Sequence, residues 1–335
     1  MKAEALRNEL VGELTEFAAG QWAQLGASFA PPAAAEQRAA DPEALLLFTL
    51  HLGRRAPRLF DEALDWLARN ESLVSTHRLR SLATGNVDRS LMEASLDWTA
   101  AQRRRAKNQR AEPLEADSLE PLFAAIDVLK GRRDPHFAHH GWARPVLRPS
   151  GKSQPPPLYA PIAFAFRLRR LLGIGVRAEI VRSLLTIRAP RVSSRMIAAT
   201  TGFAQRNVRE GLIGLHEAGV LTRVDVADDP HYGIDAAAWA TLLGLERAPD
   251  LPFHYDWIPG FRTVTSILRW LDQPGLDELS PYMRGSQART LLDAHADDLR
   301  HIGVPAHMHH GHSSEQWAGF VDVARFAART LIKRS

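Results

Sequence analysis

Four polar side chains are concentrated in five consecutive positions near the middle of the chain: Gln205, Arg206, Asn207 and Arg209. Amide and guanidinium groups can pair bidentately with base edges, arginine with guanine and asparagine or glutamine with adenine. Guanidinium groups also bind phosphate. This spacing predicts a surface that contacts nucleic acid, provided that a helix turns the four side chains outward. A solvated helix surface without a partner is the alternative.

The apolar residues of the same segment are spaced for such a helix. Val208, Leu212 and Leu215 recur at i, i+4 and i+7, so a helix there buries them on one face. Its polar neighbours must then point elsewhere. The helix start is weak, because Ala204 occupies the N-cap position where serine or threonine is preferred. Thr201 is the alternative cap.

Two glycines lie inside this helix, Gly211 and Gly214. Each costs about 1 kcal/mol relative to alanine in a helix interior. We therefore expect another helix, or the backbone of DNA, to approach closely at these positions. A tolerated local weakness is the alternative.

The neighbouring segments predict two more helices and a hairpin. Residues 176–187 carry an apolar stripe, Ser193 or Ser194 can cap a short second helix, and Gly202 can end it. After the glycine stop at Gly219, "VLTRVDV" alternates like a strand, residues 228–230 form a turn, and "HYGID" pairs back. The predicted order is three helices followed by a two-stranded wing.

This order resembles the bacterial winged helix-turn-helix transcriptional regulators of the MarR and ArsR kind. The resemblance rests on ten positions of the segment: Ile197, Ala198, Gly202, Val208, Leu212, Leu215, Glu217, Ala218, Gly219 and Val220. It implies that the third helix enters the major groove with its N-terminal residues at base edges. It also implies that Arg195 lies near a phosphate, and that Arg223 and His231 on the wing reach the minor groove or the backbone.

Positive charge is concentrated around this segment. Residues 148–226 contain thirteen basic and four acidic residues, a surplus of nine positive charges, whereas the whole chain has a net charge of only +4. Twelve of the thirteen are arginine. Such asymmetry favours a polyanionic partner, and a solvated basic surface is the alternative.

The overall composition is that of a soluble globular protein, with 45% hydrophobic and 24% charged residues in 335. The absence of cysteine excludes disulfides and thiolate zinc sites. The apolar runs are too short to span a membrane. The first residues carry Glu4, Glu9 and Glu13, unlike a secretory signal. We expect a cytoplasmic protein that does not bind a membrane.

The predicted fold is mostly α, with a central winged helix-turn-helix flanked by helical regions. We expect an N-terminal helical domain over 1–128 and a Pro/Gly-rich basic linker over 129–159. The winged helix-turn-helix occupies 160–245, and a C-terminal helical region for dimerisation or signal reception occupies 246–335.

Motifs for other chemistry are weak. The chain has no phosphate loop, nucleophile elbow or His-Glu-x-x-His motif, so we expect no enzyme, no catalytic residue and no cofactor. Imidazoles can bind transition metals, and the 301–312 loop carries several histidines: His301, His307, His309, His310 and His312. A solvated loop is the default interpretation, and we assign no metal ligands.

Together these patterns predict a sequence-specific DNA-binding regulator, a repressor that acts as a homodimer on an inverted-repeat operator in double-stranded DNA. Two alternatives stay open. The stretches "RLFDEALDWLARN" and "PSGKSQPPPLYAPIAFAFRLRRLLGIGVRAEI" resemble large bacterial proteins, some of them encoded beside nucleotidyltransferase-type toxins. That resemblance implies an antitoxin that sequesters a protein partner and regulates its own synthesis. The second alternative is a metal-responsive regulator that uses the histidine loop.

Overall fold

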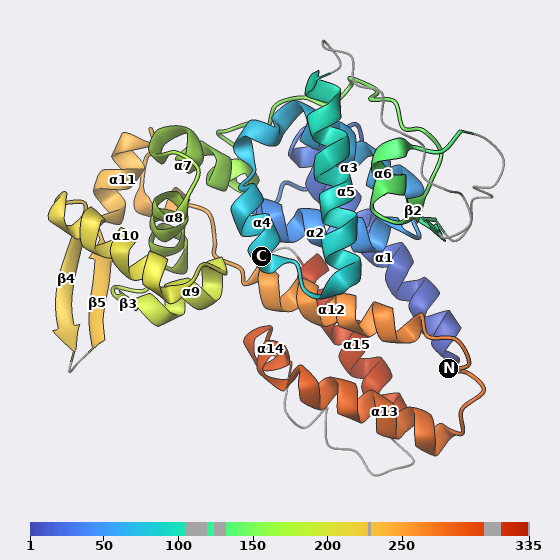
Figure 1. Ribbon diagram of the computed structural model, residues 1–335. Coiled ribbons are helices and arrows are strands. Elements are labelled where there is room, and N and C mark those ends of the chain that lie inside the picture. The colour runs from blue at the N-terminus through green and yellow to red at the C-terminus, as the bar shows by residue number, and fades with distance from the viewer. Residues whose placement is uncertain (105–118, 124–131, 227–228, 305–315, 334–335) are drawn as a thin grey trace.

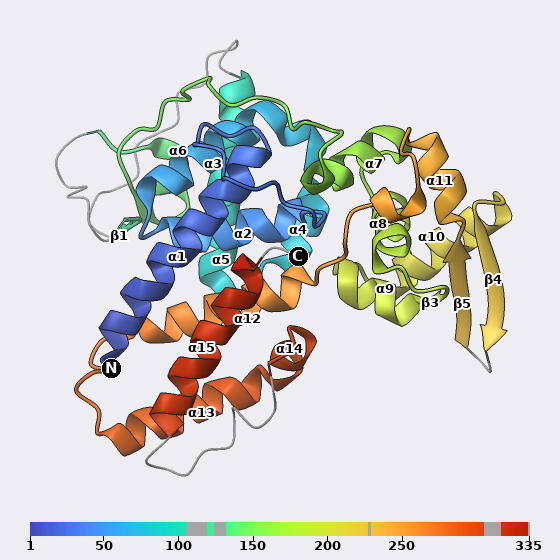
Figure 2. The ribbon, with the colours of Figure 1, turned by 180° about the vertical axis from the view of Figure 1, so that it is seen from behind.

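A computed structural model describes residues 1–104, 119–123, 132–226, 229–304 and 316–333. The fold is mostly α-helical, as the sequence predicts. A large helical body is formed from both ends of the chain, and a smaller unit with a sheet projects from its side (Figures 1 and 2). None of the helices in the described ranges is both long and apolar enough to cross a membrane.

Over residues 1–104, the α-helices of the body are α1 (Ala3–Gln24), α2 (Pro42–Gly53), α3 (Pro57–Asn70), α4 (Thr76–Leu82) and α5 (Gly85–Arg104). In α1, Leu6, Leu10 and Leu14 recur every four residues and are fully buried on one face. Asp41 caps α2 by accepting from the backbone N–H of Ala44. These helices pack together around one apolar core.

The predicted linker of residues 129–159 packs along the body over the part that the structure describes. It contains α6 (Pro135–His139) and β2 (Trp142–Ala143), and β2 pairs in parallel with β1 (Glu120–Pro121). Phe137 and Trp142 are buried in the body core. Asp65 of α3 accepts backbone N–H groups of residues 151 and 153, so the segment is fixed to the body by both apolar and polar contacts.

The C-terminal helices return to the same body. They are α12 (Trp257–Leu271), α13 (Pro281–Ala294), α14 (Ala296–His301) and α15 (Gln316–Ile332). Phe261 of α12 stacks on Phe48 of α2 with ring centroids 4.5 Å apart, and Arg325 of α15 pairs with Glu9 of α1 at 2.7 Å. The predicted regions 1–128 and 246–335 therefore share one hydrophobic core.

The projecting unit has its own core. It contains α7 (Phe164–Leu172), α8 (Val176–Ile187), β3 (Val192–Ser193), α9 (Ser194–Thr201), α10 (Gln205–Glu217), β4 (Leu221–Val226), β5 (Asp229–Ile234) and α11 (Ala236–Leu242). The sheet is antiparallel in the order β3-β5-β4. The sequence predicts only two of these strands. Because β3 has two residues, it has no alternation of its own and is defined by its pairing with β5.

Candidate nucleic-acid interface

Helix α10 buries the predicted apolar face. Val208 and Leu212 are fully buried and Leu215 is 6% exposed. A Cβ added at Gly211 would lie 2.7 Å from Cδ1 of Ile180 on α8, which confirms the close approach of another helix at that position. Around Gly214 the nearest atom would be 3.8 Å away, so the second glycine has no such packing reason.

The polar side of α10 is open to solvent at three of the four predicted positions. Arg206, Asn207 and Arg209 are exposed. Arg206 forms an i, i+4 ion pair with Glu210 at 3.0 Å, but their side chains are 88% and 63% exposed. An exposed pair of this kind contributes at most about 1 kcal/mol, so the guanidinium can exchange this partner for another.

Gln205 differs from the other three. It is half-buried, and its Nε2 donates a hydrogen bond to Oγ of Ser194 at 3.3 Å. This bond joins the first residue of α10 to the first residue of α9. Arg195 follows Ser194 and is exposed, so the structure brings Arg195 to the same end of α10 as the polar group.

The turn between α9 and α10 follows the sequence in most details. Ser193 is the N-cap of α9 and accepts from the N–H of Met196, and Gly202 ends the helix at a φ of +70°. Ala204 is the N-cap of α10 and offers no side-chain bond. Thr201 does not replace it: its hydroxyl donates to the carbonyl of Ile197 and accepts from the N–H of Phe203, which lies before α10.

The two predicted wing residues do not form one surface. In the register of β4 and β5, Arg223 is opposite Tyr232 and His231 is opposite Val224. Paired residues lie on the same face of a sheet and adjacent residues on opposite faces, so Arg223 and His231 point to opposite sides of the hairpin. Arg223 is also bonded to Asp225 of its own strand, with Nε to Oδ1 at 2.9 Å.

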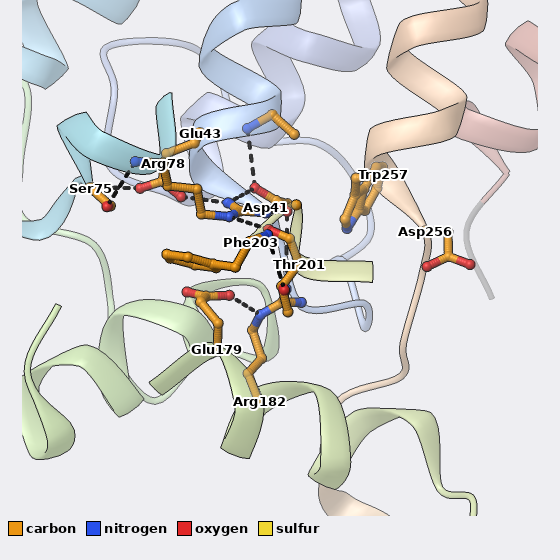
Figure 3. Close-up of polar contacts among 12 residues, drawn as sticks. Asp41, Glu43, Ser75, Arg78, Glu179, Arg182, Thr201, Phe203, Asp256 and Trp257 are labelled. Atoms are coloured by element: carbon orange, nitrogen blue, oxygen red, sulfur yellow. Dashed lines mark hydrogen bonds and ion pairs between the residues drawn. The ribbon is translucent and has the colours of Figure 1, made fainter. Parts of the chain in front are cut away.

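Two of the thirteen basic residues are not available to any partner. Arg169 of α7 and Arg182 of α8 are 4% and 2% exposed. They belong to a buried ion network, defined here as the side chains of Asp41, Glu43, Arg78, Arg169, Glu179 and Arg182. Figure 3 labels these side chains except Arg169. The surplus of positive charge at the surface of this segment is therefore smaller than the sequence count indicates.

The buried ion network is balanced, with three carboxylates and three guanidinium groups. Arg169 bridges Glu43 and Glu179 with N–O distances of 2.7 Å, and Glu179 also accepts from Arg182 at 2.7 Å. Burial alone would raise the pKa of Glu179, but Arg182 and Arg169 outweigh it and hold that pKa far below its ordinary value. The carboxylate stays charged because each of its oxygens has a cationic donor.

Arg78 connects this network to the turn between α9 and α10. It is fully buried, it is bonded to Asp41, and its Nη1 lies 2.7 Å from Oε2 of Glu43. Burial alone would lower the pKa of Arg78, but the facing carboxylates outweigh it and raise that pKa. Its Nε donates to the backbone carbonyl of Thr201 at 2.6 Å. Helix α4 of the body thus holds the C-terminal end of α9 (Figure 3).

Local sequence patterns predict little of this network. Glu179 and Arg182 are spaced i, i+3 and flank the apolar residues Ile180 and Val181 of α8, which is the one local signal of a buried pair. Asp41 directly precedes Pro42, a pattern that indicates only a helix cap, and it has that role as well. Its partners come from segments far away in the chain.

The histidine loop is largely outside the described residues, which include none of His307, His309, His310 and His312. His301 is exposed at the end of α14, and its Nδ1 lies 2.7 Å from the carbonyl oxygen of Asp297. Within the ranges that the structure covers, no three His, Asp or Glu side chains are grouped as metal ligands.

The chain has no match among protein-family models, among curated proteins or among solved structures.

Proposed function

We propose that the protein is a sequence-specific DNA-binding regulator and that residues 160–245 form a winged helix-turn-helix. The observation that carries this proposal is the division of α10 into two faces. Val208, Leu212 and Leu215 anchor the helix in the core, while Arg206 and Arg209 are exposed on it. A recognition helix needs this combination of rigid anchoring and an outward polar face.

The arrangement around α10 supports the same proposal. Helix α9, the glycine turn at Gly202 and α10 follow one another as in a helix-turn-helix, and the β4–β5 hairpin follows as a wing. The hairpin lies at the outer end of the projecting unit, away from the body (Figures 1 and 2). A long ligand such as a DNA duplex can therefore reach the hairpin without meeting the body.

In this mechanism, the N-terminal half of α10 contacts base edges. Arg206 and Arg209 would pair with guanine and Asn207 with adenine, while Arg195 binds a phosphate and fixes the register. Gln205 would join them only after it releases Ser194, so we expect it to contribute less. The protein would act as a cytoplasmic repressor and as a homodimer on an inverted repeat, with half-sites about one helical turn apart.

The test begins with selection of bound sequences from a random duplex library. The selected operator is then titrated by fluorescence anisotropy at two salt concentrations. We expect specific affinity well above that for random DNA, and a steep loss of affinity with salt as counterions are released. Arg206→Ala and Arg209→Ala should each cost about 1–3 kcal/mol of binding free energy to the operator without unfolding the protein.

The matched control is Arg289→Ala on α13, an exposed arginine that pairs with Asp293 at 3.7 Å. This control removes one positive charge at a position that is not on α10, so it should leave operator affinity unchanged. Equal operator affinity for wild type, Arg206→Ala and Arg209→Ala would refute the assigned face. Selection of no sequence at all would refute DNA recognition, and a co-purifying protein would then support the interaction-module alternative.

A further inference from the structure

A large cleft separates α9 of the projecting unit from the helical body. Its volume is about 970 Å³, at the upper end of the range for small-molecule sites, which are frequent at interfaces between structural units. One wall is α9, and the other is formed by α2, α4, α5, α12 and α14. Both views of the molecule have α9 beside α12 (Figures 1 and 2).

The inner surface of the cleft is apolar on both sides. Phe48, Leu82, Ile258 and Phe261 line it from the body, and Met196 lines it from α9. The Met196 side chain is 50% exposed, although it lies beside these groups. At about 25 cal/mol per Å² of apolar surface removed from water, an apolar ligand that covers these side chains gains substantial binding free energy.

Within the described residues, the charged and imidazole side chains that line the cleft are paired with one another, except Arg195 and His301, whose Nδ1 lies 2.7 Å from the carbonyl oxygen of Asp297. Arg269 pairs with Asp88 at 2.7 Å, His254 pairs with Asp256 at 2.8 Å, and Arg262 is bonded to Asp298. Arg195 has no acidic or hydrogen-bonding partner within the described part of the chain, and it lines the cleft at the start of α9. A cation that lies beside an apolar surface without a partner is complementary to a ligand that carries a single negative charge.

We propose that this cleft binds a small amphipathic carboxylate, with an apolar body against Met196, Leu82 and Ile258 and its carboxylate on Arg195. The ligand touches α9 and the body together, so it favours the arrangement in which these two walls are at their present separation. Such differential contact is what allows a ligand to shift a conformational equilibrium.

A regulatory consequence follows, and it rests on the proposed function. Arg195 is also the residue expected to bind a DNA phosphate. A carboxylate bound to Arg195 competes with that phosphate, so the ligand should weaken operator binding. By reciprocity, operator DNA should weaken ligand binding by the same factor.

The test measures ligand binding in the absence of DNA. The probe is 8-anilinonaphthalene-1-sulfonate, a fluorescent molecule with an apolar ring system and one negative charge. The competitors are decanoate and decanol, which have equal chain length and differ in charge. We expect saturable binding of one probe molecule per chain, displaced more strongly by decanoate than by decanol. Absence of saturable binding, or equal displacement by the two competitors, would overturn the proposal.

Three variants of the full chain locate the site. Arg195→Gln should weaken decanoate binding by about tenfold, the loss of one charge-assisted bond, and leave decanol unchanged. Met196→Glu should weaken both decanoate and the probe. Met283→Glu is the matched control, because Met283 is equally exposed at 51% but lies on α13 outside the cleft. An equal loss in Met196→Glu and Met283→Glu would contradict the location.

The regulatory consequence has a separate readout. Decanoate added to the operator complex should lower its anisotropy for wild type and have a smaller effect for Arg195→Gln. If the probe binds but no DNA is bound, the function proposal fails and the ligand site stands. If DNA binds and the probe does not, the ligand site fails and the function proposal stands.

Discussion

Replacing Arg78 tests whether the buried ion network holds the projecting unit to the body. Arg78→Met keeps most of the side-chain volume and removes the charge. In the wild type, three carboxylates face three guanidinium groups. In the variant they would face two, and the carbonyl of Thr201 would lose the donor that lies 2.6 Å away.

The expected cost follows from the burial of these groups. Arg78, Asp41 and Glu43 are 0%, 3% and 0% exposed, so water does not replace the lost donor. Removing one partner of a buried ion pair costs about 3–5 kcal/mol. A buried carbonyl without a donor adds about 1–3 kcal/mol. We therefore expect Arg78→Met to lower the free energy of unfolding by at least about 4 kcal/mol at pH 8.

The cost should depend on pH. In the wild type, burial opposes ionisation of Asp41, but Arg78 and Arg182 outweigh it and hold the pKa of Asp41 below its ordinary value. The stabilisation that Asp41 provides is therefore present above about pH 4 and is lost as the pH falls through the folded pKa. Without Arg78, the effect of burial dominates and raises the pKa of the Asp41 carboxyl group. The folded variant then binds a proton that the unfolded chain does not. The stability deficit relative to wild type should grow from pH 5 to pH 8.

Urea unfolding followed by circular dichroism measures both effects. The matched control is Arg80→Met on the same helix, where the side chain is 55% exposed and pairs with Glu93 at 2.7 Å. That exposed pair should be worth less than about 1 kcal/mol. Adding Asp41→Asn to Arg78→Met restores the charge balance and should recover part of the loss. Equal deficits for Arg78→Met and Arg80→Met, or a deficit independent of pH, would refute this account.

Two further predictions concern packing and pH. Gly214→Ala should stabilise the protein by up to about 1 kcal/mol. Gly211→Ala places its Cβ 2.7 Å from Cδ1 of Ile180 and should be less stable than Gly214→Ala by at least about 1 kcal/mol. Equal stabilities of the two variants in urea unfolding would contradict the tight contact between α8 and α10. His51 of α2 is buried, and burial together with nearby arginines lowers its pKa to about 3. Because the unfolded chain protonates near pH 6.5 and the folded protein does not, wild type should lose about 2 kcal/mol between pH 7 and pH 5 at this site. His51→Gln should remove that loss, while the same change at the exposed His77 should retain it.

The local features of the candidate interface follow from the sequence. Helix α10 has the predicted buried row, because a 3.6-residue period forces Val208, Leu212 and Leu215 onto one side. The cap at Ser193 and the stop at Gly202 are also local, since each depends on one side chain and the backbone a few residues away. These features need no knowledge of the rest of the fold.

Only the tertiary structure decided which charges are available and where a ligand can enter. Arg169 and Glu43 are 126 positions apart, and no local pattern distinguishes this buried arginine from an exposed one. Likewise, the cleft exists because α12 returns to the body and faces α9. Burial is a property of contacts between distant segments, and it determines whether the same guanidinium group stabilises the core or remains free to bind an anion.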